Sequence, residues 1–235
     1  MKWNEVFCTT FRALRENHNI QAPSKLSLIE QCRADDSELC LEMMAKPFLL
    51  SEAQMNHAAE RYHLGRSKSG KTIYWMIDHH GIVRDGHIGN GWVSHMLKSR
   101  CPEVAPYIVT KHCLFGLHQL SIVNCQLSIG IVESERSAVI LSELYPQSLW
   151  MAYAYPANFS EHLLAPLVDH SVVLFPNADE TMDNYLAFLE IADQARRRYH
   201  LDVTVSNLLE DRTTPSQKSR KIDLLTFYLE SIRNP

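Results

Sequence analysis

Long apolar runs are missing from this 235-residue sequence. No stretch approaches the roughly 20 consecutive apolar residues that a membrane-spanning helix needs. The first residues, MKWNEVFCTTFRALREN, contain no uninterrupted apolar segment of the kind found in secretion signals. We therefore expect a cytoplasmic protein that makes no contact with a membrane.

Closely spaced cysteines are also missing, because no C-x-x-C pair occurs. Scattered cysteines are typical of reduced thiols in a cytosol rather than of a disulfide framework or a zinc-binding module. We expect neither disulfides nor zinc. The six cysteines are Cys8, Cys32, Cys40, Cys101, Cys113 and Cys125.

Positive charge is in slight deficit, with 23 Lys and Arg against 27 Asp and Glu, for a net charge of −4. A global positive field, which would indicate a nucleic-acid partner, is thus excluded. Local basic clusters remain, and each is either a solvated surface or a set of phosphate contacts. The clusters are Arg61 with Arg66, Lys68 and Lys71; Arg196 with Arg197 and Arg198; and Arg212 with Lys218, Arg220 and Lys221.

Glycine is scarce, and six of the eight glycines fall between residues 65 and 91. In that region Thr72 to Ile77 is β-branched and aromatic, residues 78–81 read DHHG, and residues 82–84 resume an extended pattern. The pattern predicts antiparallel hairpins. Upstream, helical spacing over residues 3–14 and a capping box at Ser51 and Gln54 predict helices. Residues 1–110 are therefore expected to form a smaller α+β region.

The stretch GRSKSGKT, residues 65–72, fits the phosphate-loop pattern G-x-x-x-x-G-K-[ST]. That loop binds phosphates only where a strand leads in and a helix leads out. Here a predicted strand follows the stretch. We interpret it as a basic hairpin turn, not as a nucleotide-binding loop.

From about residue 111 the pattern becomes α/β. Apolar runs of strand length alternate with helical spacing, which predicts a parallel sheet covered by helices. We expect this second domain to span residues 111–235. The predicted strands cover residues 127–132, 148–153, 171–175 and 201–205, and the predicted helices cover 136–145, 159–167, 179–199 and 224–232.

Two of the predicted strands run into acidic residues. The first ends in Glu133-Ser134-Glu135, and the third runs through Pro176 into the sequence NADE, residues 177–180. If these strands are neighbours, their carboxylates converge at one edge of the sheet, where oxygen ligands suit Mg²⁺. Acids at such turns also serve as helix caps, and this alternative stays open.

The segments IVESERSAVI and VVLFPNADET resemble the toprim domain of bacterial primases, type IA and type II topoisomerases and related nucleases. The segments GRSKSGKTIYWMIDHHGIVRDGHIG, CLFGLHQL and LLEDRTTPSQKSRKIDLLTFYLE also resemble primase-like toprim proteins of bacterial mobile elements. The resemblance implies a toprim-like sheet over about half of the chain, residues 112 to 232. It also implies a DNA-related activity that uses Mg²⁺.

Carried over by position, the resemblance makes Glu133 the catalytic acid or base and Asp179 a metal ligand. Asn177 stands where the family has its first metal-binding aspartate, and an amide supplies an oxygen but no charge. Ser134 and Met182 also replace glycines of the family pattern, so the resemblance implies a weakened site. Candidates for the missing carboxylate are Glu135, Glu180 and Asp183.

Three functions remain open from the sequence. The first is a Mg²⁺-dependent primase, nucleotidyltransferase or nuclease of toprim type. The second is a non-catalytic toprim module that binds DNA or a replication protein. The third is a protein-interaction domain. The residues proposed to contact nucleic acid are Arg61, Arg66, Lys68, Lys71 and Arg84.

Overall fold

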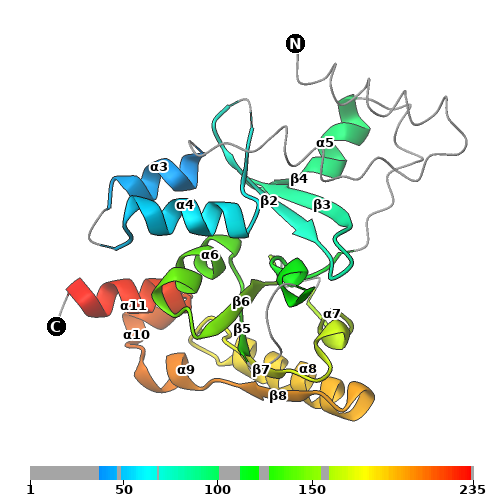
Figure 1. Ribbon diagram of the computed structural model, residues 1–235. Helices are drawn as coiled ribbons and strands as arrows, with labels where there is room; N and C mark the ends of the chain where they lie inside the picture. Colours follow the sequence, from blue (N-terminus) through cyan, green and yellow to red (C-terminus); the bar gives the residue numbers. More distant parts are fainter. Residues whose placement is uncertain are drawn as a thin grey trace, which may run out of the picture. The chain divides into compact units, whose positions relative to one another are not determined.

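The computed structural model describes residues 37–46, 49–67, 69–100, 112–121, 127–154 and 159–233 (Figure 1). The chain divides into two compact units, Met1–Cys113 and Leu114–Pro235. The helix expected over residues 3–14 lies outside the described residues. No helix in the described ranges is long and apolar enough to cross a bilayer.

In the described part of the first unit, two helices precede a four-stranded antiparallel sheet in the order β1-β2-β3-β4, and a third helix follows it. Ser51 and Gln54 form the expected capping box at the start of α4. The helices are α3 (Glu38–Met44), α4 (Glu52–Arg61) and α5 (Val93–Arg100), and the strands are β1 (Gly65–Arg66), β2 (Thr72–Ile77), β3 (Val83–Ile88) and β4 (Gly91–Trp92).

One face of this sheet forms an apolar core. Alternate residues of β2 point the same way because side chains alternate along a strand. They pack with the start of α5, and the cluster comprises Ile73, Trp75, Ile77, Val83 and Val93. The predicted strand after GRSKSGKT is confirmed, because β2 begins at Thr72.

The second unit is built on a four-stranded parallel sheet in the order β6-β5-β7-β8. All four predicted strands are present within one residue of the expected bounds. They are β5 (Ser128–Val132), β6 (Ser148–Ala152), β7 (Ser171–Leu174) and β8 (Asp202–Val205). Together with the antiparallel sheet of the first unit, they confirm the predicted fold class.

Helices of different lengths connect and cover the parallel strands. In Figure 1, α8 runs beside β8, and α11 lies beside α6. The elements η2, α9 and α10 were not predicted. The helical elements are η2 (Leu117–Ser121), α6 (Glu135–Leu144), α7 (Glu161–Leu164), η4 (Ala165–Leu167), α8 (Asp183–Tyr199), α9 (Leu208–Arg212), α10 (Pro215–Ser219) and α11 (Leu224–Arg233).

The start of α8 differs from the prediction, because the helix begins at Asp183 and not at Asp179. Residues 179–182 form a loop, in which Met182 has a left-handed backbone with a φ of 61°. The Asp179 carboxylate accepts hydrogen bonds from this loop and from the first turn of α8. The acid predicted as the first residue of the helix therefore lies before it and accepts from its first two N–H groups, while Met182 holds the N-cap position.

Candidate functional site

The polar ends of β5 and β7 meet at one edge of the parallel sheet. The two strands are direct neighbours, with Ile131 opposite Leu174. Glu133 follows β5 and Asn177 follows β7, so both lie where open parallel sheets bind ligands. The Asn177 Nδ2 donates a hydrogen bond to Glu133 Oε2. The Tyr153 hydroxyl donates to the same oxygen over 3.4 Å.

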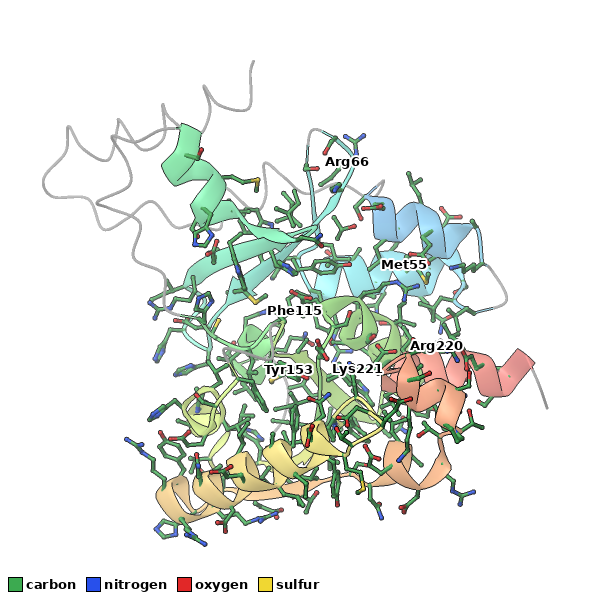
Figure 2. All side chains as sticks on the ribbon, turned by 180° about the vertical axis from the view of Figure 1, so that it is seen from behind. Met55, Arg66, Phe115, Tyr153, Arg220 and Lys221 are labelled. Atoms are coloured by element: carbon green, nitrogen blue, oxygen red, sulfur yellow. The ribbon has the colours of Figure 1, made fainter. Side chains whose placement is uncertain are left out.

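A cavity of about 340 Å³ opens at this edge. The segment between α10 and α11 supplies half of its lining, and Figure 2 labels Arg220 and Lys221 on that segment. Two carboxylates, one amide, two hydroxyls and two cations thus share one small space. The lining residues are Glu133, Ser134, Asn177, Arg220, Lys221, Ile222, Asp223 and Thr226.

Asp223 is a residue of this cavity that the sequence analysis missed. Its Oδ1 accepts from the backbone N–H of Thr226, over 2.8 Å, which caps the start of α11. Its Oδ2 accepts from the Ser137 hydroxyl of α6. An aspartate immediately before the apolar α11 predicts a helix cap, but no local pattern places it beside Glu133, which lies 90 positions earlier.

The surroundings of Glu133 disfavour its charged form. Burial raises the pKa of this carboxyl, and the nearby charges of Asp223 and Glu135 raise it further. The hydrogen bonds from Tyr153 and Asn177 act in the opposite direction without cancelling the rise. Burial also raises the pKa of the Tyr153 phenol, which stays protonated and donates to Glu133.

The Asp179 carboxylate forms its hydrogen bonds with the residues that directly follow it, Thr181 to Asn184. It accepts from the backbone N–H groups of Thr181, Asp183 and Asn184 and from the Thr181 hydroxyl. Burial acts to raise the pKa of Asp179, but these hydrogen bonds outweigh it and the net pKa is lowered. The side chain is 5% exposed, and the cavity lining given above does not include it.

The other three acids proposed for the site lie apart from the cavity lining as well. Glu135 is buried in the first turn of α6, Glu180 is exposed in the loop before α8, and Asp183 is exposed at the first position of α8. The structure thus brings together Glu133 and Asn177 and adds Asp223, while Asp179, Glu135 and Glu180 occupy neighbouring positions. The catalytic and metal-binding roles of these residues stay predictions.

The oxygen donors around the cavity match Mg²⁺ in chemical type, because this ion takes carboxylate, carbonyl and water oxygens. Asn177 Oδ1 is buried and has no hydrogen-bond partner among the described residues, so an acceptor is available beside Glu133. Within the ranges that the structure describes, no group of three or more His, Cys, Asp or Glu could hold a metal ion. A metal at this edge would be held by Glu133, Asp223 and the neutral Asn177 oxygen.

The basic residues proposed to contact nucleic acid have different surroundings. The Arg84 Nε donates to Asp78 over 2.6 Å, and the carboxylate of Asp78 also fixes the following turn. Burial acts to raise the pKa of Asp78, but its hydrogen bonds and the charge of Arg84 lower it. The charge of Arg84 is thus neutralised inside the fold.

The remaining basic candidates lie on the described hairpin and on α4. Arg66 lies on β1 near the end of the β1–β2 hairpin (Figure 2), and Arg61 ends α4. Lys71 is exposed, and its ammonium has no partner among the described residues. Lys68 lies outside the described residues. Lys71 is therefore the cation on this hairpin that is best placed for a ligand.

Comparisons with known proteins give a family and a fold. A family model described as a domain of unknown function (DUF6371) matches residues 39–178. No curated protein matches the chain. Among solved structures, a DnaG catalytic core is similar with a TM-score of 0.53 and 12% identity, and the match covers 89% of this chain and 78% of that one.

A second similar structure is a DnaG primase catalytic domain bound to ssDNA. It has a TM-score of 0.51 and 11% identity, with 84% of this chain and 79% of that chain covered. At these identities the likeness concerns the fold. The toprim-like parallel sheet, preceded by an antiparallel sheet, is confirmed.

Proposed function

We propose that this chain, which belongs to the DUF6371 family, is a toprim-like protein with a DNA-related role in which metal-dependent catalysis is impaired. The observation that carries the proposal is the hydrogen bond from the Asn177 amide to the Glu133 carboxylate. The resemblance to toprim domains implies an aspartate at this position. An amide leaves the metal with less negative charge and places an N–H group on the carboxylate that would do the chemistry.

The cavity retains the elements of a weak metal site. Glu133, Asp223 and the Asn177 oxygen would hold Mg²⁺, which would polarise a phosphoryl oxygen and stabilise its developing charge. The raised pKa of Glu133 favours its neutral form, and a neutral carboxyl is a poor ligand. The neutral amide at position 177 and the raised pKa of Glu133 both lower the affinity of the site for Mg²⁺.

The proposed DNA contact uses the cations of the first unit. Lys71 is exposed on the hairpin, and Arg61 and Arg66 lie nearby in sequence. The similar primase domain that is bound to ssDNA supports single-stranded DNA as the first ligand to test. We further propose a cytoplasmic role in mobile-element replication or mobilisation, with a replication protein as partner, on the strength of the sequence resemblance.

Calorimetric titration of the full chain with Mg²⁺ and Mn²⁺ tests the metal part of the proposal. We expect weak binding that is lost in Glu133→Gln and kept in Glu190→Gln, a matched change at an exposed acid of α8 outside the cavity. Tight binding together with primer synthesis or nicking by the parent protein would contradict impaired catalysis.

The second candidate function is a binding module without any chemistry, and the Asn177 amide favours this candidate too. Assays of primer synthesis and nicking, run beside DNA binding, separate the two candidates. DNA binding without either reaction at saturating Mn²⁺ would establish the non-catalytic module. Slow, Mn²⁺-dependent turnover that depends on Glu133 would establish the impaired enzyme.

A further inference from the structure

Three ring-bearing residues lie opposite one another on the antiparallel sheet of the first unit, and a fourth contacts the last of them. Tyr74 on β2 is opposite His87 on β3, and His87 is opposite Trp92 on β4. Residues directly opposite one another place their side chains on the same face of a sheet. The ring centroids of His87 and Trp92 are 5.1 Å apart, and those of Trp92 and His112 are 4.9 Å apart. We call Tyr74, His87, Trp92 and His112 the ring row.

The ring row lies on the face of the sheet opposite the apolar core. Ile73 and Trp75, which flank Tyr74 in β2, belong to the buried cluster that packs with α5. Tyr74, His87 and Trp92 are half-buried, whereas His112 is exposed. Cross-strand ring pairs stabilise a sheet by themselves. A row that carries two histidines and a tryptophan and ends in an exposed ring offers, in addition, flat surfaces to a ligand.

A cation lies beside the turn that joins two strands of the ring row. The Lys71 ammonium lies over the β3–β4 turn, 3.3 Å from the point where a Cβ on Gly89 would stand. This turn connects His87 to Trp92. Gly89 has a φ of 57°, a left-handed conformation that glycine adopts without strain. The exposed ammonium thus lies beside the turn between His87 and Trp92, within reach of a strand that crosses this end of the sheet.

We propose that the ring row and Lys71 form a base-stacking platform for single-stranded nucleic acid. Bases would stack on Trp92 and His112, while Lys71 would contact a backbone phosphate. Single strands fit this chemistry because their bases are open to stacking, whereas duplex bases are already stacked and paired. The inference rests on the proposed DNA-related role and names the surface and the kind of strand that would carry it.

The test measures binding of a fluorescein-labelled 20-nucleotide single strand and of the matching blunt duplex to the full chain, by fluorescence anisotropy at low salt. Removal of one stacking ring weakens binding roughly 5- to 100-fold. We therefore expect Trp92→Ala to lose affinity for the single strand by that amount. Trp92→Phe keeps a ring and should retain most of the affinity. His162→Ala, which removes a ring contact with Tyr199 in the second unit, is the matched control and should bind as the parent does.

Tryptophan fluorescence provides a readout that does not depend on the alanine variant being folded. Trp75 and Trp150 are buried, and Trp3 lies outside the described residues, so the measurement is made in a Trp3→Phe background. In that background, quenching by the single strand should come from Trp92 and should be lost when Trp92→Phe is added. Affinity of Trp92→Ala within twofold of the parent, or equal affinity for the duplex, overturns the platform and leaves the DNA-related role standing. Failure of the parent to bind either strand form overturns the proposed DNA role itself.

Discussion

At the scale of single residues, Asn177 determines which group satisfies one oxygen of the Glu133 carboxylate. With an aspartate at position 177, two carboxylates would lie together after β5 and β7, and a shared proton or a bound cation would relieve their repulsion. The amide of Asn177 requires neither, because its N–H satisfies the Glu133 oxygen directly. Asn177 therefore adds no negative charge beside Glu133, where burial and the charge of Asp223 already raise the pKa of the carboxyl.

Asn177→Asp should raise the affinity for Mg²⁺, because it adds a charged oxygen ligand and removes the N–H donor from Glu133. One added carboxylate in a Mg²⁺ site should strengthen binding roughly tenfold or more, measured by calorimetry. Ala178→Ser, next to it in the chain, serves as the control and should leave the affinity unchanged. Equal affinities of the Asn177→Asp variant and the parent would mean that Asn177 does not face the ion.

Asp179 should contribute to the stability of the fold rather than to metal binding, because its carboxylate accepts four hydrogen bonds at the start of α8. Asp179→Asn should lower the free energy of unfolding by roughly 1–2 kcal/mol at pH 7, measured by urea denaturation. Asp193→Asn, on the exposed side of α8, should change it little.

The pH dependence of the Asp179 effect follows from its lowered pKa. The folded pKa lies below the ordinary value of 3.8, so the stabilisation is fully present above that value. It is lost as the pH falls through the folded pKa, where the carboxylate takes up its proton. The difference between parent and Asp179→Asn should therefore shrink as the pH falls below about 4. A difference that stays constant down to pH 3 would rule out the carboxylate charge as its cause.

At the scale of elements, both sheets use a glycine opposite a tryptophan. Gly130 of β5 is opposite Trp150 of β6, and Gly86 of β3 is opposite Trp75 of β2. A Cβ at Gly130 would lie 2.7 Å from Trp150 Cζ3, and one at Gly86 would lie 2.8 Å from Trp75 Cε3. The absent side chain lets each large ring lie flat on the neighbouring strand.

Gly130→Ala should therefore lower the free energy of unfolding by about 1–3 kcal/mol, the cost of overpacking a buried contact. Gly91→Ala is the control, because the nearest atom to its Cβ, Ile88 O, would be 4.0 Å away. The double variant Gly130→Ala with Trp150→Leu should show a favourable coupling in a denaturation cycle, since the ring that clashes is gone. If the losses in free energy of unfolding simply add, the Trp150 ring is not the group that the new Cβ at position 130 clashes with.

The sequence predicted elements well where the signal was local. Apolar runs of strand length gave all four parallel strands, and the capping box at Ser51 gave the start of α4. The same signals were present but unused at α10, where Thr214, Pro215 and Gln217 form a capping box with proline at the first helical position. The site was predicted only in part because Asp223 reaches Glu133 through the tertiary packing of α11 against α6, which no spacing in the sequence encodes.

At the scale of the whole molecule, the net charge of −4 restricts where nucleic acid can bind. A chain with excess negative charge repels a phosphate backbone over most of its surface, so binding has to come from a local cluster of cations. The described hairpin offers Lys71, beside the β3–β4 turn, and Arg66, with Arg61 close in sequence, while Arg84 is neutralised by Asp78. Few phosphates can therefore be contacted at once.

The salt dependence of single-strand binding should accordingly be shallow. For single strands the slope of log K against log salt is about −0.7 per phosphate contact, so roughly three or four contacts predict a slope of about −2 to −3. Lys71→Gln should make the slope less negative by about 0.7. Lys46→Gln should leave it unchanged, because Lys46 is paired with Glu42 on the exposed end of α3. Anisotropy titrations between low and physiological salt measure both values. A slope steeper than about −5 would require far more phosphate contacts than this hairpin provides.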